Sequence, residues 1–202
     1  MKVRTSHRGT LLPVCASRIA RDGEVPFIRW AFMHPIRLQC ICPTEVDDSV
    51  RFLLGTLALS EAEANWLSYE PPSEFQPEPS ECHINAAIQL NFAGGSVVSG
   101  WAIWQDKAAG FVEAEFHTVW RAPSGALQDV TPRRQGQPHV LFFPDTSRAL
   151  TLTEQNGLPA VVTYDNVRIQ DGEVRTGISR HVRVLQTELI YTHGLASREA
   201  NP

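Results

Sequence analysis

Alternating apolar and polar residues predict a β-strand between Phe111 and Arg121, the clearest pattern in the chain. A Pro-Ser-Gly turn follows at 123–125, and residues 126–131 are predicted to return as the partner strand of a hairpin. Residues 97–104 also have the composition of a strand, with Gly100 at a possible bulge. In the 111–121 strand, Val112, Ala114, Phe116, Thr118 and Trp120 would share one face, and Glu113, Glu115, His117 and Val119 the other.

Helical periodicity appears in three places in the first half of the chain. Ser60 and Glu63 form a capping-box pattern that predicts a second helix containing Trp66 and Leu67. A third helix is predicted from an N-cap at Ser80 to the Gly-Gly pair at 94–95. The first helix is predicted from apolar residues spaced on one helical face, Val46, Val50, Leu53, Leu54 and Leu57.

The second half of the chain favours strands. Residues 140–143 and 160–164 are apolar or β-branched, 167–174 resemble a hairpin around Asp171-Gly172, and 182–191 fit either a strand or a helix. The elements together predict an α+β protein with a single domain over residues 1–195 and a disordered tail at 196–202.

Composition and charge narrow the function classes. The chain has 202 residues, 43% of them hydrophobic, and a formal net charge of −4, which argues against a nucleic-acid partner. No apolar run approaches the roughly 20 residues that a membrane-spanning helix needs. We therefore expect a cytoplasmic protein with no membrane association.

Four cysteines, Cys15, Cys40, Cys42 and Cys82, are expected to be free thiols in a reducing compartment. Cys40 and Cys42, together with Cys82 and a histidine, supply the ligand types of a zinc site. The repeated Cys-x-x-Cys spacing of such sites is absent, and small buried residues are the favoured interpretation of Cys40 and Cys42. We expect no metal and no other cofactor.

A thiol, an imidazole and a carboxylate occur in the order needed for nucleophilic catalysis. Cys82 would lie in the first turn of its helix, where the helix dipole lowers a thiol pKa. His117 on the 111–121 strand could act as the base, and Asp129 on the returning strand could orient the imidazole. A three-residue turn would place His117 and Asp129 diagonally on one face of the hairpin, whereas a two- or four-residue turn would separate them.

Four further residues are candidates for the same site. Gln76 could join the Cys82 backbone N–H in an oxyanion hole, although a solvated loop glutamine is the favoured interpretation. Asn85 could cap the helix or line the cleft, and Glu115 could line the cleft from the face that carries His117. His83 is an alternative base, but its position directly after Cys82 would point its side chain about 100° away on a helix.

The residues around His117 and Asp129 carry a resemblance to a known superfamily. The segments His117-Thr118-Val119-Trp120 and 125–132 (GALQDVTP) resemble the "His-Ala-Trp … Gly-Trp … Asp-Pro-Thr" pattern of transglutaminase-like proteins, and Cys82 completes their Cys, His, Asp order. Papain-like and NlpC/P60-like peptidases share a circularly related core. The resemblance covers residues 80–132. It implies a papain-like α+β core at about 76–145, with the nucleophile helix packed on an antiparallel sheet, Cys82 as nucleophile, His117 as general base and Asp129 as its orienting group.

The sequence therefore predicts a thiol-dependent hydrolase or acyltransferase that acts on a peptide, a protein or a small amide or thioester. Two alternatives stay open: a non-catalytic binding or accessory domain of the same fold, and the zinc protein described above. The non-catalytic alternative is motivated by departures from the superfamily pattern, since His83 replaces the usual Trp after the cysteine and Trp120 follows His117 by three positions instead of two.

Overall fold

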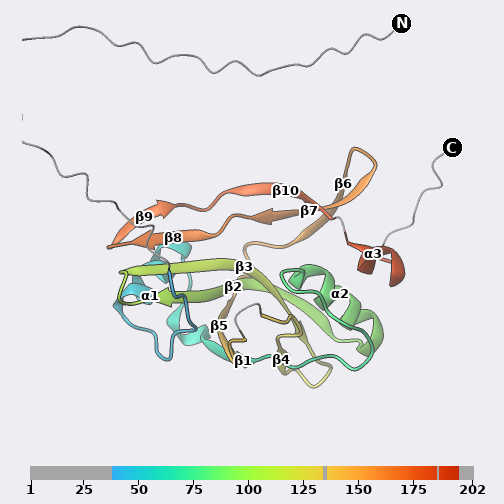
Figure 1. Ribbon diagram of the computed structural model, residues 1–202, viewed down its shortest axis with the longest axis horizontal. Coiled ribbons are helices and arrows are strands. Elements are labelled where there is room, and N and C mark those ends of the chain that lie inside the picture. The colour runs from blue at the N-terminus through green and yellow to red at the C-terminus, as the bar shows by residue number, and fades with distance from the viewer. Residues whose placement is uncertain (1–37, 134–135, 186, 196–202) are drawn as a thin grey trace, which may run out of the picture. The chain divides into compact units, whose positions relative to one another are not determined.

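The computed structural model describes residues 38–133, 136–185 and 187–195. They form an α+β fold with two antiparallel sheets and few helices (Figure 1). The helices are α1 (Asp48–Leu57), the short 3₁₀ helix η1 (Glu61–Glu63), α2 (Cys82–Ala93) and α3 (Glu188–Thr192). The predictions made for residues 1–37, which include Cys15, and for the tail at 196–202 lie outside the described residues.

The larger sheet has seven strands, in the order β1-β5-β2-β3-β8-β9, with β4 paired to one end of β3. Its strands are β1 (Asn65–Ser68), β2 (Ser96–Asp106), β3 (Phe111–Arg121), β4 (Leu127–Gln128), β5 (His139–Pro144), β8 (Val167–Gln170) and β9 (Glu173–Thr176). The smaller sheet has the order β10-β7-β6, with β6 (Thr151–Gln155), β7 (Leu158–Tyr164) and β10 (Arg180–Val184).

The hydrophobic core lies where α1 packs against the larger sheet. The helix buries the apolar stripe predicted from its sequence, and Asp47 caps its N-terminus by accepting from the Val50 N–H at 3.1 Å. The facing sheet residues come from β2, β3, β5 and β8. The main side chains of this cluster are Val50, Leu53, Leu57, Trp101, Ile103, Val112, Phe116, Leu141, Phe143, Val167 and Ile169.

Several predicted elements match the structure closely. Strand β3 has the predicted bounds, and α2 ends at a Gly94 C-cap as its sequence indicates. The 182–191 segment, which fitted either a strand or a helix, divides into the end of β10 and helix α3. The hairpin around Asp171-Gly172 is also present, as β8 and β9.

Three local predictions are wrong. The helix expected to contain Trp66 and Leu67 is strand β1, which pairs with β5 and buries only Leu67. Ser60 does accept a hydrogen bond from Ala62 N–H, but it starts only the short η1. Glu81, not Ser80, is the N-cap of α2, and Ser80 takes a positive φ of 67° just before it. Tertiary pairing overrides local propensity in β1, because strand partners satisfy backbone groups that the sequence alone would assign to a helix.

Gly100 is not at a bulge, because its pairing with His117 on β3 and with Pro144 on β5 is regular. Its role is close packing between three central strands. A Cβ atom at this position would lie 2.1 Å from the Phe143 carbonyl oxygen and 2.7 Å from the Phe142 ring. The backbone of β2 or β5 would have to move to accept it.

We therefore expect Gly100→Ala to lower the free energy of unfolding by about 3 kcal/mol, the upper part of the range for overpacking a core. Gly55→Ala in α1 is the matched control. No atom lies within 4 Å of its added Cβ, and alanine favours a helix interior, so a gain of about 0.5–1 kcal/mol is expected. Urea unfolding measures the free energy of unfolding of both variants. Equal stabilities of the two variants would contradict the close-packing role of Gly100.

Among the described residues, no helix is both long enough and apolar enough to cross a membrane.

Candidate active site

Strand β3 has a gap along one edge, and the site is built there. On one side β3 pairs with β2 along its whole length. On the other side it pairs with β8 through 111–114 and with β4 at 120–121. Within the described ladders, residues 115–119 therefore have no strand partner on that side. The N-terminus of α2 reaches β3 here, and the His83 Nδ1 atom lies 2.7 Å from Thr118 Oγ1.

Cys82 is the first residue of α2 and is only 5% exposed. The loop before it is held by Asn85, whose Nδ2 donates to the Glu78 carbonyl at 2.8 Å and whose Oδ1 accepts from the Glu78 N–H at 3.1 Å. The same amide donates to Thr131 Oγ1 at 3.2 Å. Asn85 thus joins the helix start to the segment after Asp129, and it does not line the cleft around the thiol.

The hairpin has the register on which the triad depends. Arg121 pairs with Leu127, and the Ala122 N–H donates to the Ala126 carbonyl at 2.9 Å, as a three-residue turn requires. His117 and Asp129 consequently meet, with His117 Nε2 3.3 Å from Asp129 Oδ1. This distance is that of an ion pair, although neither ring nitrogen makes a well-directed hydrogen bond among the described residues.

Asp129 is fully buried and held by three groups besides His117. Arg133 Nη2 donates to its Oδ2 at 2.6 Å, and the Thr131 N–H donates to its Oδ1 at 3.0 Å. Its own backbone carbonyl accepts from the Glu70 N–H at 2.9 Å, which attaches this segment to the end of β1. The carboxylate therefore has a fixed orientation toward the imidazole.

A cavity of about 310 Å³ brings the thiol, the imidazole and several polar side chains together. Trp104 and Glu115 form part of its wall, and Trp104 Nε1 donates to Glu115 Oε2 at 2.8 Å. The lining residues include Cys40, Ser80, Cys82, Trp104, Glu113, Glu115, His117, Thr131, Arg133, Gln137 and Val140.

The electrostatics of the thiol and His117 favour an ion pair. Burial opposes the ionisation of Cys82, but the nearby imidazoles of His83 and His117 hold the pKa of its thiol well below the ordinary value. Burial also opposes the charged form of His117, yet Asp129 and the Cys82 thiolate raise its pKa well above the ordinary value. At neutral pH both shifts favour a thiolate beside an imidazolium.

The two carboxyl groups next to His117 shift in opposite directions. Burial would raise the pKa of Asp129, but His117, Arg133 and the Thr131 N–H together hold it below the ordinary value. Burial raises the pKa of Glu115, and the nearby His117 only partly offsets that effect. Asp129 is therefore the permanent counter-charge, whereas Glu115 gains a proton more readily and can then donate a hydrogen bond into the cavity.

His83 differs from its predicted placement, whereas Gln76 is a solvated loop residue, as its favoured interpretation predicted. The His83 side chain does not point away from the thiol, since its Nδ1 lies 3.6 Å from Cys82 Sγ as well as contacting Thr118, and its Nε2 lies 3.4 Å from Thr163 Oγ1. Gln76 is exposed and is not among the residues that line the cavity. Of the four additional candidates, Glu115 alone lines the cavity that contains Cys82 and His117.

The zinc alternative finds no support in the described part of the chain. No three Cys, His, Asp or Glu side chains come together there in an arrangement that could hold a metal ion. Cys40 and Cys42 are free and half-buried on either side of Ile41, which makes a single bridge to Gln105. They are less buried than the sequence interpretation expected. Cys40 contributes to the cavity wall next to the site.

Sequence reasoning missed Arg133, Thr118 and Thr163 as parts of the site. Arg133 follows Asp129 by four residues, and this spacing is the one signal that could have suggested the pairing. Thr118 is a single residue from His117 but lies on the opposite face of β3, where the alternation placed it without suggesting a role. Thr163 approaches His83 from β7, a contact across 80 positions.

Comparison of the chain with protein-family models, with curated proteins and with solved structures gave no significant match in any of the three.

Proposed function

We propose that this protein is a thiol-dependent hydrolase or acyltransferase that acts on an amide or thioester, with Cys82 as nucleophile in a papain-like or transglutaminase-like core. The observation that supports this most is the convergence of Cys82, His117 and Asp129 at one cavity, with His117 3.3 Å from a buried aspartate. The opposed pKa shifts of the thiol and the imidazole add to it.

The reaction begins when the Cys82 thiolate attacks the substrate carbonyl carbon and forms a C–S bond. Nε2 of His117 faces Asp129, which leaves Nδ1 as the nitrogen that delivers a proton to the departing amine or thiol as its bond to the carbonyl carbon breaks. Water or an amine then attacks the acyl-enzyme, His117 takes its proton, and the Cys82 thiolate is released.

The oxyanion formed during the attack requires hydrogen-bond donors. The first backbone N–H groups of a helix have no partner within the helix, and Cys82 and His83 occupy the first two positions of α2. These N–H groups and the positive end of the helix dipole would stabilise negative charge on the carbonyl oxygen. Trp104, in the cavity wall, offers a flat surface against which the substrate can pack.

The pH dependence of Cys82 alkylation tests the proposal. In the native protein, Cys82 should react with iodoacetamide at pH 6 as a thiolate, because the pKa of its thiol is depressed. His117→Gln removes the charge but keeps a polar side chain of similar size, and we expect it to slow the reaction at pH 6 by about 10–100-fold. Mass spectrometry of the peptides measures each cysteine separately.

Cys40 is the internal control, because burial and nearby acidic groups raise the pKa of its thiol. It should react slowly at pH 6 in both proteins. If Cys82 follows the same profile as Cys40, or stays inert until the protein is denatured, the catalytic proposal fails and Cys82 is a packing residue. If the coupled profile is found, a screen of amide and thioester substrates against the native protein and Cys82→Ser tests for turnover.

A further inference from the structure

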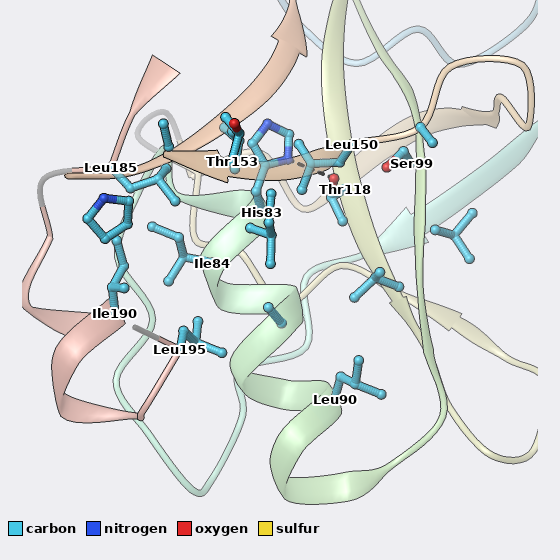
Figure 2. Close-up of a pocket in the computed structure, with 18 of the residues that line it drawn as sticks. His83, Ile84, Leu90, Ser99, Thr118, Leu150, Thr153, Leu185, Ile190 and Leu195 are labelled. Carbon is cyan, nitrogen blue, oxygen red and sulfur yellow. Dashed lines mark hydrogen bonds between the residues drawn. The ribbon is translucent and has the colours of Figure 1, made fainter. Parts of the chain in front are cut away.

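A second, larger cavity of about 850 Å³ lies on the opposite side of β3 from His117. Thr118 lines it, whereas its neighbour His117 lines the first cavity, as alternation along a strand requires. Figure 2 shows His83, Ile84 and Leu90 of α2 on one side of this space and Leu185 and Ile190 near it from the C-terminal segments. Cys82 and His117 do not line this cavity, but His83 does, and the His83 Nδ1 atom lies 3.6 Å from Cys82 Sγ.

The wall of the second cavity is predominantly aliphatic. Its volume falls within the range of roughly 300–1,000 Å³ typical of small-molecule sites, which are mostly apolar with a few polar groups. Helix α2 supplies one side and strand β7 another. Its main apolar residues are Ile84, Ala87, Leu90, Leu150, Val161 and Leu185. Such a surface favours a ligand whose bulk is hydrocarbon, since its burial removes apolar area from water.

The polar groups of the cavity indicate an uncharged ligand. Arg148 is paired with Asp145 at 2.5 Å. The other two charged side chains of the wall, Arg121 and Glu154, are exposed and of opposite sign. The arginine and carboxylate charges on the described lining residues therefore balance. Deeper in, the wall offers the hydroxyl of Thr118, which is 1% exposed and bonded to His83, so a ligand can form a hydrogen bond there.

We propose that this cavity is a binding site for an uncharged molecule with a flexible aliphatic chain and one hydrogen-bonding group. The aliphatic chain of the ligand packs between α2 and β7, and its polar group forms a hydrogen bond with the Thr118–His83 pair. Binding there does not require that Cys82 be catalytic, because neither Cys82 nor His117 lines the cavity.

A series of straight-chain 1-alkanols from butanol to dodecanol tests the proposal by calorimetric titration of the full chain. We expect saturable binding whose affinity rises about threefold to fourfold per added methylene and then stops rising once the chain fills the cavity. Decanoate and decyltrimethylammonium have the same alkyl chain length as decanol but carry a charge. Both should bind at least about tenfold more weakly than decanol, because removing a charged group from water is unfavourable where the site has no unpaired counter-charge.

Ala87→Phe fills part of the cavity from α2 and should abolish binding, while Ala87→Ser should keep it. Ala87 is only partly buried, so both variants are expected to fold, which circular dichroism checks. Four results would each overturn the proposal. They are no saturable binding by the native protein, equal binding by Ala87→Phe, an affinity that rises with chain length without reaching a limit, and tighter binding of either charged probe than of decanol. The alkylation profile of Cys82 is measured independently of all four.

Discussion

Asp129→Ala is expected to lower the free energy of unfolding by about 3–5 kcal/mol, the range for removing one member of a buried ion pair. Asp129 is fully buried between two cationic groups, with Arg133 at 2.6 Å and His117 at 3.3 Å, and each of those side chains is only 9% exposed. Without the carboxylate, Arg133 keeps its charge in a buried position with no counter-charge. Chemical denaturation at pH 6 measures the loss.

The exposed pair of His181 and Asp165 provides the matched control. Its atoms lie 3.1 Å apart, but both side chains are 40% or more exposed. Asp165→Ala should therefore change stability by less than about 1 kcal/mol. Adding Arg133→Met to Asp129→Ala should recover part of the loss, since it removes the unpaired charge. A small effect of Asp129→Ala, or no recovery in the double variant, would contradict the buried ion-pair assignment.

The stability lost in Asp129→Ala should depend on pH. The pKa of Asp129 is lowered on folding, so its contribution is present above the unfolded value of about 3.9 and is lost as the pH falls through the folded pKa. The pKa of His117 is raised, so its contribution is complete below the unfolded value of about 6.5 and is lost as the pH rises through the folded pKa. The stability difference between native protein and Asp129→Ala should be largest between about pH 4 and 6.5.

Removing both imidazoles next to Cys82 is expected to slow its alkylation at pH 6 by about 10²–10³-fold. With His83→Gln and His117→Gln combined, burial acts alone and raises the pKa of the thiol. Even an unperturbed thiol of pKa about 8.5 would be ionised to only roughly 0.3% at pH 6. Alkylation is quenched at timed intervals, and mass spectrometry of the peptides gives the rate at Cys82. The native protein, the two single variants and the double variant are compared.

The two single variants should differ. His117 lies against Asp129, which favours its charged form, whereas the His83 ring contacts the hydroxyls of Thr118 and Thr163. We expect His117→Gln to have the larger effect, and His83→Gln a smaller one through the 3.6 Å contact with the thiol. Thr56→Val, which removes a hydroxyl hydrogen bond to the Phe52 carbonyl in α1, serves as a control that should leave the rate unchanged. A double variant that still reacts rapidly at pH 6 would show that neither imidazole ionises Cys82.

The structure also shows where local reasoning fails near the site. The start of α2 was placed correctly within a residue or two, but its cap is Glu81, because the loop before it is held by Asn85 and not by a Ser80 side chain. The His83 side chain was expected to point away from Cys82. The contact forms because both side chains lie in the first turn of α2, where the helix meets the gap in β3.

Features that depend on neighbours along the chain could be read from the sequence. The period of two in β3 assigned His117 and Glu115 to one face, and turn geometry showed that a three-residue turn would bring His117 to Asp129, although the sequence left the length of the turn open. The apolar stripe of α1 likewise predicted which of its residues are buried. These properties follow from backbone periodicity and turn geometry, which act over a few residues.

The remaining features depend on contacts between segments that are distant along the chain. The pairing of β1 with β5, the gap along β3, the contact of Thr163 with His83 and the second cavity all join segments that are far apart in the sequence. Local propensity carries little information about such contacts, because they form wherever burial of apolar area and satisfaction of backbone hydrogen bonds are best for the whole chain. The order Cys, His, Asp was readable in the sequence, whereas the groups that set their charges became visible only in the folded protein.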